Sequence, residues 1–226
     1  MTPADPRADE ATGETDLVAA ADLLLRLRRR GITDQRLAGA IEAVPRRLFV
    51  PAAWQAFATI ETSIPIDCGQ TLAAPEIVGR MTAALDLLPS HRVLQVGVGS
   101  GYQTAILAGL CRHVYGVERY RSLIEAARQR LTTLGIANVT LVHGDGFIGL
   151  PTDAPFDRIV VTAAVTELPP AIRDQIGPGG AAVIAIGPQE DEQRLVKIER
   201  GADGLNETEV AKVRFVPLVP GKAAVL

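Results

Sequence analysis

Three glycines at alternating positions give the chain its most distinctive chemical pattern. Residues 93–96 read V-L-Q-V, and Gly97, Gly99 and Gly101 follow directly. Because glycine has no side chain, a strand that ends in such a turn lets a ligand approach its backbone closely. The third glycine comes one residue earlier than in the dinucleotide pattern G-x-G-x-x-G, and larger side chains occupy the region where a pyrophosphate would bind. We therefore predict a turn that faces an uncharged or zwitterionic group.

Two acidic residues follow this turn at the ends of later predicted strands. Glu118 stands about 19 residues after Gly99, where an acidic side chain typically accepts hydrogen bonds from two ribose hydroxyls. Asp145 ends the next strand, within H-G-D-G, and is placed to accept a hydrogen bond from an adenine amino group. The carboxyl ends of parallel strands meet at one edge of a sheet. The glycine turn, Glu118 and Asp145 together predict a nucleoside site at that edge.

The elements that must position these residues alternate between strand and helix. Strands are expected from the short apolar runs at 93–96, 114–117, 139–142, 159–162 and 181–186. Helices are expected between them at 102–110, 121–134 and 168–176. This alternation predicts an α/β fold, a doubly wound, mostly parallel, Rossmann-like sheet with helices on both faces. Alternating residues at 194–199 and 208–216, around G-A-D-G, predict an antiparallel C-terminal hairpin that brings the sheet to seven strands.

The first part of the chain is expected to be helical and then irregular. Helical spacing of apolar residues and prolines predicts helices at 16–30, 34–44, 52–57 and 75–88. Residues 59–74 have no helical period and include Pro65 and Gly69, so we expect a long extended or looped segment. We predict a disordered tail over residues 1–16 and a single domain over 17–226. Residues 17–90 would supply N-terminal helices and a segment covering substrate and cofactor, and 91–226 the sheet core.

The composition argues against several classes of function. Of 226 residues, 47% are hydrophobic and 22% are charged, and the net charge is −3. The sequence has no dense basic cluster and no uncharged apolar stretch of about 18 residues, so we expect no nucleic-acid or membrane partner. Its three histidines are scattered, so we expect no metal site. Two isolated cysteines and an acidic, polar N-terminus without signal-peptide features predict a cytoplasmic protein.

Several motifs, spread in order along the chain, resemble a known family. The glycine turn, Glu118 and Asp145 resemble the cofactor site of class I S-adenosylmethionine-dependent methyltransferases, as does the I-G-P-G-G turn at 176–180. Over roughly residues 17–220 the chain resembles, more narrowly, the protein-L-isoaspartate (D-aspartate) O-methyltransferases. That resemblance rests on V-P-R-R-L-F-V-P at 44–51, I-P-I at 64–66 with G-Q-T at 69–71, H-G-D-G at 143–146, V-T-A-A at 161–164 and R-F-V-P-L-V at 214–219.

The resemblance implies a protein-repair reaction. Members of the family transfer a methyl group from S-adenosylmethionine to the α-carboxylate of an L-isoaspartyl residue in a damaged protein or peptide, and release S-adenosylhomocysteine. The ester then closes to a succinimide, which can reopen to normal aspartate. A carboxylate with a reference pKa of about 3.5 is already ionised at pH 7, so the enzyme's main task is positioning. Isoaspartyl proteins or peptides are the implied partners, and we expect a monomer.

The family's motifs also imply which residues form the site. Those implied to bind S-adenosylmethionine are Gly69, Gln70, Thr71, Gln95, Gly97, Val98, Gly99, Gly101, Glu118, Arg119, Asp145, Gly146, Thr162 and Ala163. Those implied to bind the isoaspartyl peptide are Ile66, Ala74, Val216, Pro217 and Leu218. The 66–71 segment is implied to close over the cofactor, and Thr71 and the position of Ala73 to act in catalysis. Because residues two apart in an extended segment face the same way, we expect Thr71 and Ala73 to point together.

The chain departs from the family's pattern at three of these positions. The family usually reads G-Q-T-[IV]-S-x-P, and this chain has Ala73 at the active-site serine. An acidic residue usually stands at Gln95, and a small or hydroxylated one at Val98. A lost hydrogen bond to a charged group is worth roughly 1.5–3 kcal/mol, so we expect slow isoaspartyl methylation, and we expect Gln95→Glu to tighten cofactor binding. The alternatives are a carboxyl methyltransferase with another acceptor and a cofactor-binding protein with little catalysis.

Overall fold

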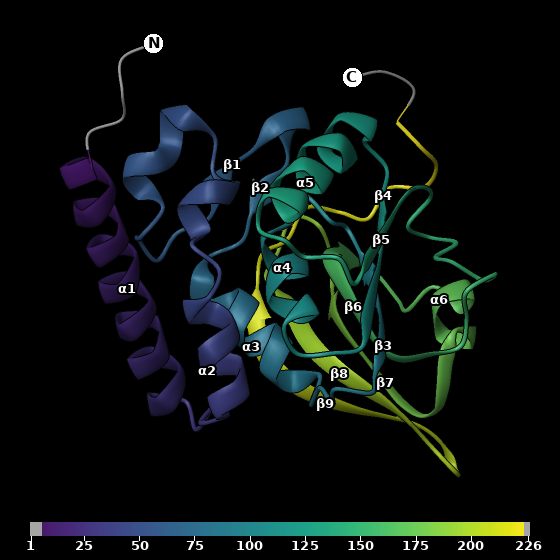
Figure 1. Cartoon of the computed structure of the whole chain (residues 1–226). Coiled ribbons are helices and arrows are strands. Elements are labelled where there is room, and N and C mark those ends of the chain that lie inside the picture. The colour runs from purple at the N-terminus through teal and green to yellow at the C-terminus, as the bar shows by residue number, and fades with distance from the viewer. Residues whose placement is uncertain (1–5, 224–226) are drawn as a thin grey trace.

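A seven-stranded sheet forms the centre of the computed structural model, which describes residues 6–223 (Figure 1). Its strands are β3 (Arg92–Val96), β4 (His113–Glu118), β5 (Val139–His143), β6 (Phe156–Val165), β7 (Ile176–Ile186), β8 (Gln193–Gly201) and β9 (Gly204–Val213). Strands β3 to β7 pair in parallel, whereas β8 pairs antiparallel with β7, and β9 with β8. The predicted fold class is therefore confirmed, including the antiparallel hairpin at the C-terminal end.

The order of the strands places a ligand site beside β3. The order is β5-β4-β3-β6-β7-β8-β9, so the chain winds outward from β3 to β5 and then returns to the other side of β3 with β6. In open parallel sheets, ligands bind outside the carboxyl ends of the strands, where the winding reverses. The glycine turn that follows β3 lies at this switch point.

Helices cover both faces of the sheet, but unequally. They are α1 (Pro6–Arg29), α2 (Gln35–Glu42), α3 (Pro75–Ala84), α4 (Tyr102–Ala108), α5 (Arg121–Thr133) and α6 (Pro170–Asp174). Helices α1 to α5 contribute to one hydrophobic core, and Ile172 of α6 belongs to a second core. Consecutive strand residues alternate between these cores, with Val93 in the first and Leu94 in the second. Figure 1 shows α1 and α2 to the left of the sheet and α6 to its right.

Residues 59–74, called the covering segment below, are irregular, as the sequence predicts. Strands β1 (Ile64–Pro65) and β2 (Thr71–Leu72) form a small antiparallel hairpin, and a 3-10 turn at Asp67–Gly69 joins them. Two further 3-10 helices, η1 (Arg46–Phe49) and η2 (Ala52–Phe57), precede this segment. The covering segment leads directly into α3, which Pro75 opens.

The N-terminal helix and α3 have different ends from those expected. Helix α1 begins at Pro6, so it runs through most of the stretch predicted as a disordered tail, and residues 1–5 lie outside the described residues. Asp16 of α1 pairs with Arg47, with 2.5 Å between Oδ2 and Nε, which ties the helix to η1. Helix α3 ends at Ala84, before the predicted end at 88, because Asp86 adopts a left-handed φ of +46°.

The later elements also differ at their ends. The I-G-P-G-G run at 176–180 forms the first part of β7, whereas a turn was expected, and β7 accommodates it by a register shift against β6. Helix α6 accordingly spans only Pro170–Asp174. Strand β9 ends at Val213, and the following extended residues meet β6 only through a bridge between Ala164 and Pro217. Over residues 6–223, no helix is both long and apolar enough to span a bilayer.

Candidate active site

The glycine turn is shaped by contacts with the protein itself. Gly97 has φ +86°, and a Cβ placed there would lie 2.3 Å from Thr162 Oγ1 of β6. The Thr162 hydroxyl donates to the Gly97 carbonyl at 2.7 Å, with the Val96 carbonyl 3.1 Å away. A side chain at Gly97 would therefore be strained and would displace the threonine that ties β6 to the turn. The absence of a side chain at Gly97 therefore lets Thr162, rather than a ligand, approach the turn closely.

The other two glycines make room for neighbouring elements. A Cβ at Gly101 would lie 3.1 Å from the Ala127 Cβ, so this glycine lets α4 start close to α5. At Gly99 the nearest atom to a Cβ would be Ile66 Cδ1 of the covering segment, at 3.4 Å. The covering segment thus packs onto the turn.

Glu118 orders the site from the end of β4. Its Oε2 accepts the Gly99 N–H at 3.0 Å, and its Oε1 accepts the N–H groups of Arg119 and Tyr120 at 2.8 and 3.1 Å. The residue is only 7% exposed. A carboxylate has about four acceptor positions, so one remains after these three bonds. Glu118 therefore holds the turn and keeps an acceptor for a ligand hydroxyl.

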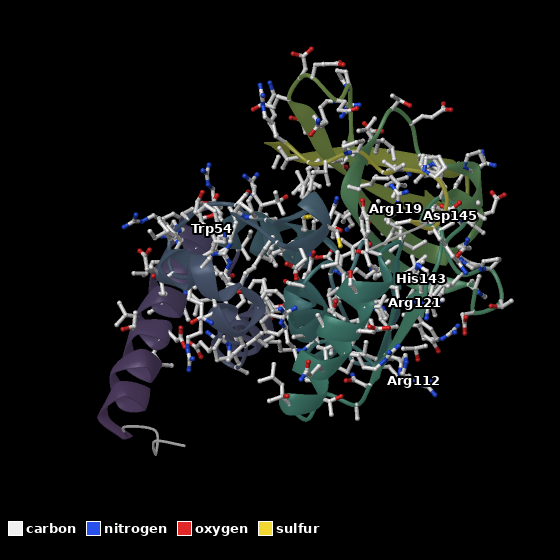
Figure 2. The ribbon with its side chains drawn as sticks, turned by 90° about the horizontal axis from the view of Figure 1, so that it is seen from above. Trp54, Arg112, Arg119, Arg121, His143 and Asp145 are labelled. Atoms are coloured by element: carbon white, nitrogen blue, oxygen red, sulfur yellow. The ribbon has the colours of Figure 1, made fainter. Side chains whose placement is uncertain are left out.

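A cavity opens beside Glu118 at the carboxyl ends of the strands. It is lined by Gln70, Thr71, Val96, Gly97, Gly99, Val117, Glu118, Arg119, Gly146, Thr162, Ala163 and residues 216–219. Figure 2 shows Arg119 and Asp145 on the side of the molecule away from Trp54. His143 lies beside them, and its Nε2 is 2.9 Å from the Arg119 carbonyl oxygen. The structure therefore brings together nine of the residues implied for the cofactor and three implied for the peptide, in one cavity.

A second cavity adjoins the first. Both are lined by Thr71, Gly97, Gly99 and Thr162, and the second is also lined by Leu72, Ala73, Val78, Gln95, Val98, Ser100, Tyr102, Gln103 and Phe215. Thr71 thus stands at the boundary between the cavities. Ala73 lines the second cavity together with Thr71 and Leu72.

Gln95 is bonded within the protein. Its Oε1 accepts from Thr104 Oγ1 at 2.7 Å, and its Nε2 donates to the Gly97 carbonyl at 3.2 Å. The side chain is 1% exposed and does not line the cavity beside Glu118. Gln95 therefore supports the glycine turn, and both of its side-chain polar atoms are hydrogen-bonded within the protein.

Some residues implied by the family lie outside the two cavities. Asp145 uses its Oδ1 to accept the Phe147 N–H at 2.8 Å, and only the neighbouring Gly146 lines the first cavity. Gly69 lies in the 3-10 turn of the covering segment, and Ala74 is the residue before α3. Gly101 packs on Ala127. Ile66 reaches the site through its contact with Gly99.

Several lining residues were missed by the sequence analysis. Val96 is the last residue of β3 and Val117 the residue before the end of β4, so their positions alone pointed to the cavity. Ser100, Gln103 and Phe215 line the second cavity. Ser100 lies within the glycine turn and Phe215 within the motif at 214–219, so a signal for these two was present in the sequence.

Residues 216–218 form one wall of the first cavity. The Val216 carbonyl accepts the Ala164 N–H and the Leu218 N–H donates to the Ala164 carbonyl, both at 2.8 Å. Neither group is therefore available to a peptide. Because extended residues alternate in direction, Pro217 presents its carbonyl to the other side, and proline has no N–H. The Val216 carbonyl and the Leu218 N–H therefore serve the fold, by joining this segment to β6.

Comparison with known proteins identifies the family. A model of the protein-L-isoaspartate (D-aspartate) O-methyltransferases matches residues 19–223. The chain belongs to this family. A relative from Xanthobacter autotrophicus, a protein-L-isoaspartate O-methyltransferase, is 47% identical over 218 residues, which cover 96% of this chain and all of that protein. The sequence resemblance to the family is therefore confirmed.

Two solved structures agree with this family assignment. A protein-L-isoaspartate O-methyltransferase has a TM-score of 0.77 and 26% identity; the match covers 88% of this chain and 65% of that longer one. A putative protein-L-isoaspartate O-methyltransferase from Plasmodium falciparum, in complex with S-adenosyl-L-homocysteine, has a TM-score of 0.73 and 26% identity. That match covers 88% of this chain and 97% of the other.

Proposed function

We propose that this member of the isoaspartate methyltransferase family transfers a methyl group from S-adenosylmethionine to the α-carboxylate of L-isoaspartyl residues in proteins or peptides. One observation carries the proposal: the cavity anchored by Glu118 adjoins the cavity of Ala73, and Thr71 lines both. A donor held at the strand ends and an acceptor held under the covering segment would meet at Thr71. The chain's membership of the family agrees with this arrangement.

The strand ends fit the cofactor. Glu118 has one acceptor position left for the ribose, and Thr162 holds the turn that would face the methionine part. Gly146, Ala163 and Leu218 form an uncharged wall suited to the adenine. When bound, S-adenosylmethionine supplies a methyl group on a positively charged sulfur, which is a good leaving group. The net charge of the lining side chains Glu118 and Arg119 is zero, which suits a ligand that carries charges of both signs.

The acceptor side needs residues that orient a carboxylate. The isoaspartyl α-carboxylate is ionised at pH 7, so no base is required to remove a proton. The Thr71 hydroxyl is a hydrogen-bond donor at the boundary of the two cavities. Ala73 lines the same space without a hydroxyl, so one donor is absent and a slow rate follows. The Pro217 carbonyl faces away from β6 and is a group of residues 216–218 that could meet the peptide backbone.

The proposal includes the monomeric state expected from the sequence. Cys68 and Cys111 are free thiols, which supports a reducing, cytoplasmic compartment. The partners are then cytoplasmic proteins or peptides that contain isoaspartyl residues.

A pair of matched peptides tests the proposal. The peptides differ only in whether one residue is isoaspartyl or aspartyl, and methyl transfer is followed with S-adenosylmethionine labelled in its methyl group. We expect the isoaspartyl peptide to be methylated and its aspartyl twin to be ignored. Equal labelling of both peptides would indicate a different acceptor, and binding of the cofactor without labelling of either would indicate a non-catalytic protein.

A further inference from the structure

A single buried arginine makes unusually many contacts with the covering segment and its flank. Arg46, the first residue of η1, is 7% exposed. Its Nη1 lies 2.9 and 3.4 Å from the carbonyl oxygens of Ala58 and Ile60, and its Nη2 lies 2.9 and 3.1 Å from those of Thr62 and Ala73. All four acceptors are backbone carbonyls. The guanidinium therefore holds main chain rather than side chains.

The charge of Arg46 is not neutralised by an ion pair. Among the described side chains, no carboxylate pairs with it. Burial lowers the pKa of the Arg46 guanidinium, while Tyr102 and Glu61 act in the opposite direction. A buried cation is costly unless hydrogen bonds replace its water, so the carbonyls are what keep this side chain in place.

The four carbonyls lie on both sides of the hairpin that carries Thr71. Ala58, Ile60 and Thr62 come before β1, and Ala73 comes directly after β2. Arg46 therefore closes the neck of a loop whose tip reaches the cavities. The strands of that hairpin have only two residues each, so their own ladder adds little rigidity.

The short helix that carries Arg46 is packed near the glycine turn. Phe49, at the other end of η1, packs on Tyr102 with 5.6 Å between ring centroids. Tyr102 begins α4 and lines the second cavity. A path of direct contacts thus runs from the turn after β3 to the neck of the covering segment.

We propose that Arg46 is a positioning residue for methyl transfer. It sets where Thr71 and Ala73 stand relative to the cofactor cavity, and so it governs the acceptor rather than the donor. This inference rests on the proposed function. A lysine has a compact charge with three donors and no planar fork, so it does not reach carbonyls on both sides of the neck at once.

The chain offers a matched control arginine. Arg36 donates from Nη1 to the Leu87 carbonyl at 2.9 Å and from Nη2 to the Leu110 carbonyl at 2.6 Å. It performs the same kind of main-chain bridging, but none of these residues lines either cavity. Arg36→Lys therefore reproduces the loss of a guanidinium fork without touching the covering segment.

The test compares Arg46→Lys and Arg36→Lys with the wild type. Initial rates on an isoaspartyl peptide give kcat and KM, calorimetry gives the Kd of S-adenosylhomocysteine, and hydrogen exchange reports on the amides of residues 62–73. For Arg46→Lys we expect kcat/KM to fall about ten- to hundred-fold with a raised peptide KM, and faster exchange in 62–73. We expect the Kd to change less than about three-fold. Arg36→Lys is expected to keep kcat and KM within about two-fold.

Other results would overturn the inference. A smaller folded fraction alone would lower kcat and leave the peptide KM and the exchange of 62–73 unchanged. Equal kinetic losses in both variants would likewise show that Arg46 has only a general structural role. If the wild type methylates no isoaspartyl peptide, the proposed function fails, and the exchange of 62–73 in the two variants still decides whether Arg46 holds the segment.

Discussion

The two halves of the candidate active site are built in different ways. The strand-end half consists of β3, β4 and β6 in register, with the turn tied to Glu118 and Thr162. The covering segment has two strands of two residues each, and its neck is held by side chains from elsewhere, Arg46 on its carbonyls and Arg26 on Glu61. Regular hydrogen-bonded ladders support the first half, and contacts from distant side chains support the second. This difference predicts that substitutions in the two halves affect different ligands.

The largest effect is expected at the strand-end half. Glu118→Ala should raise the Kd of both S-adenosylmethionine and S-adenosylhomocysteine by about a hundred-fold, because it removes a charged acceptor from ribose and releases the Gly99 N–H. Calorimetric titration of each nucleoside measures this. Glu118→Gln keeps one acceptor oxygen, so its Kd for each nucleoside should lie between those of the wild type and Glu118→Ala. An unchanged Kd in Glu118→Ala would show that the cavity holds neither ligand.

An opposite pattern is expected in the covering segment. Ala73→Ser should raise kcat/KM on an isoaspartyl peptide about ten-fold by adding one hydrogen bond to a charged acceptor, and Thr71→Ala should lower it. Ala73→Ser should leave the Kd of S-adenosylhomocysteine nearly unchanged, because Ala73 lines only the second cavity. Steady-state kinetics combined with calorimetry separates these quantities. If Ala73→Ser lowers the Kd of S-adenosylhomocysteine without raising kcat/KM on the peptide, the added hydroxyl contacts the cofactor, and the prediction is wrong.

A smaller effect, opposite to that expected from the sequence, is predicted for Gln95→Glu. The amide Nε2 donates to the Gly97 carbonyl, and a carboxylate there would face that oxygen without a proton to share. The cost of burying this charge should lower the melting temperature and weaken cofactor binding several-fold. Thermal melts and the Kd of S-adenosylhomocysteine measure it. Tighter binding in Gln95→Glu would contradict this prediction and support the expectation from the sequence, in which the added negative charge attracts the cofactor.

The smallest effect concerns a residue outside both halves. Burial and the nearby Arg158 lower the pKa of His91 below its usual 6.5. His91 therefore binds a proton more readily in the unfolded chain than in the folded one. Its contribution to the free energy of unfolding is full above about pH 6.5 and is lost as the pH falls below that value. We expect His91→Gln to lose less melting temperature than the wild type between pH 7 and 5, with unchanged Kd and KM at pH 7. Parallel pH profiles of the two proteins would contradict this role.

The sequence predicts the strand-end half well because its signals are local. Apolar runs mark the strands, and parallel strands must bring their ends together, so Gly97, Glu118 and Gly146 line one cavity. The four carbonyls of Arg46 were not predictable, because they lie 12 to 27 residues away and carbonyls carry no residue type. The internal bonds of Gln95 were missed for the same reason. The end of α3 depends on the left-handed backbone of Asp86, which the spacing of apolar residues does not encode.

A crystal structure with S-adenosylhomocysteine and an isoaspartyl peptide tests most directly whether the two halves divide the ligands. We expect a ribose hydroxyl within hydrogen-bonding distance of the Glu118 carboxylate. We also expect the isoaspartyl α-carboxylate within reach of the Thr71 hydroxyl, with Ala73 beside it. A peptide bound away from the covering segment, or a ribose that does not touch Glu118, would contradict this division of the ligands.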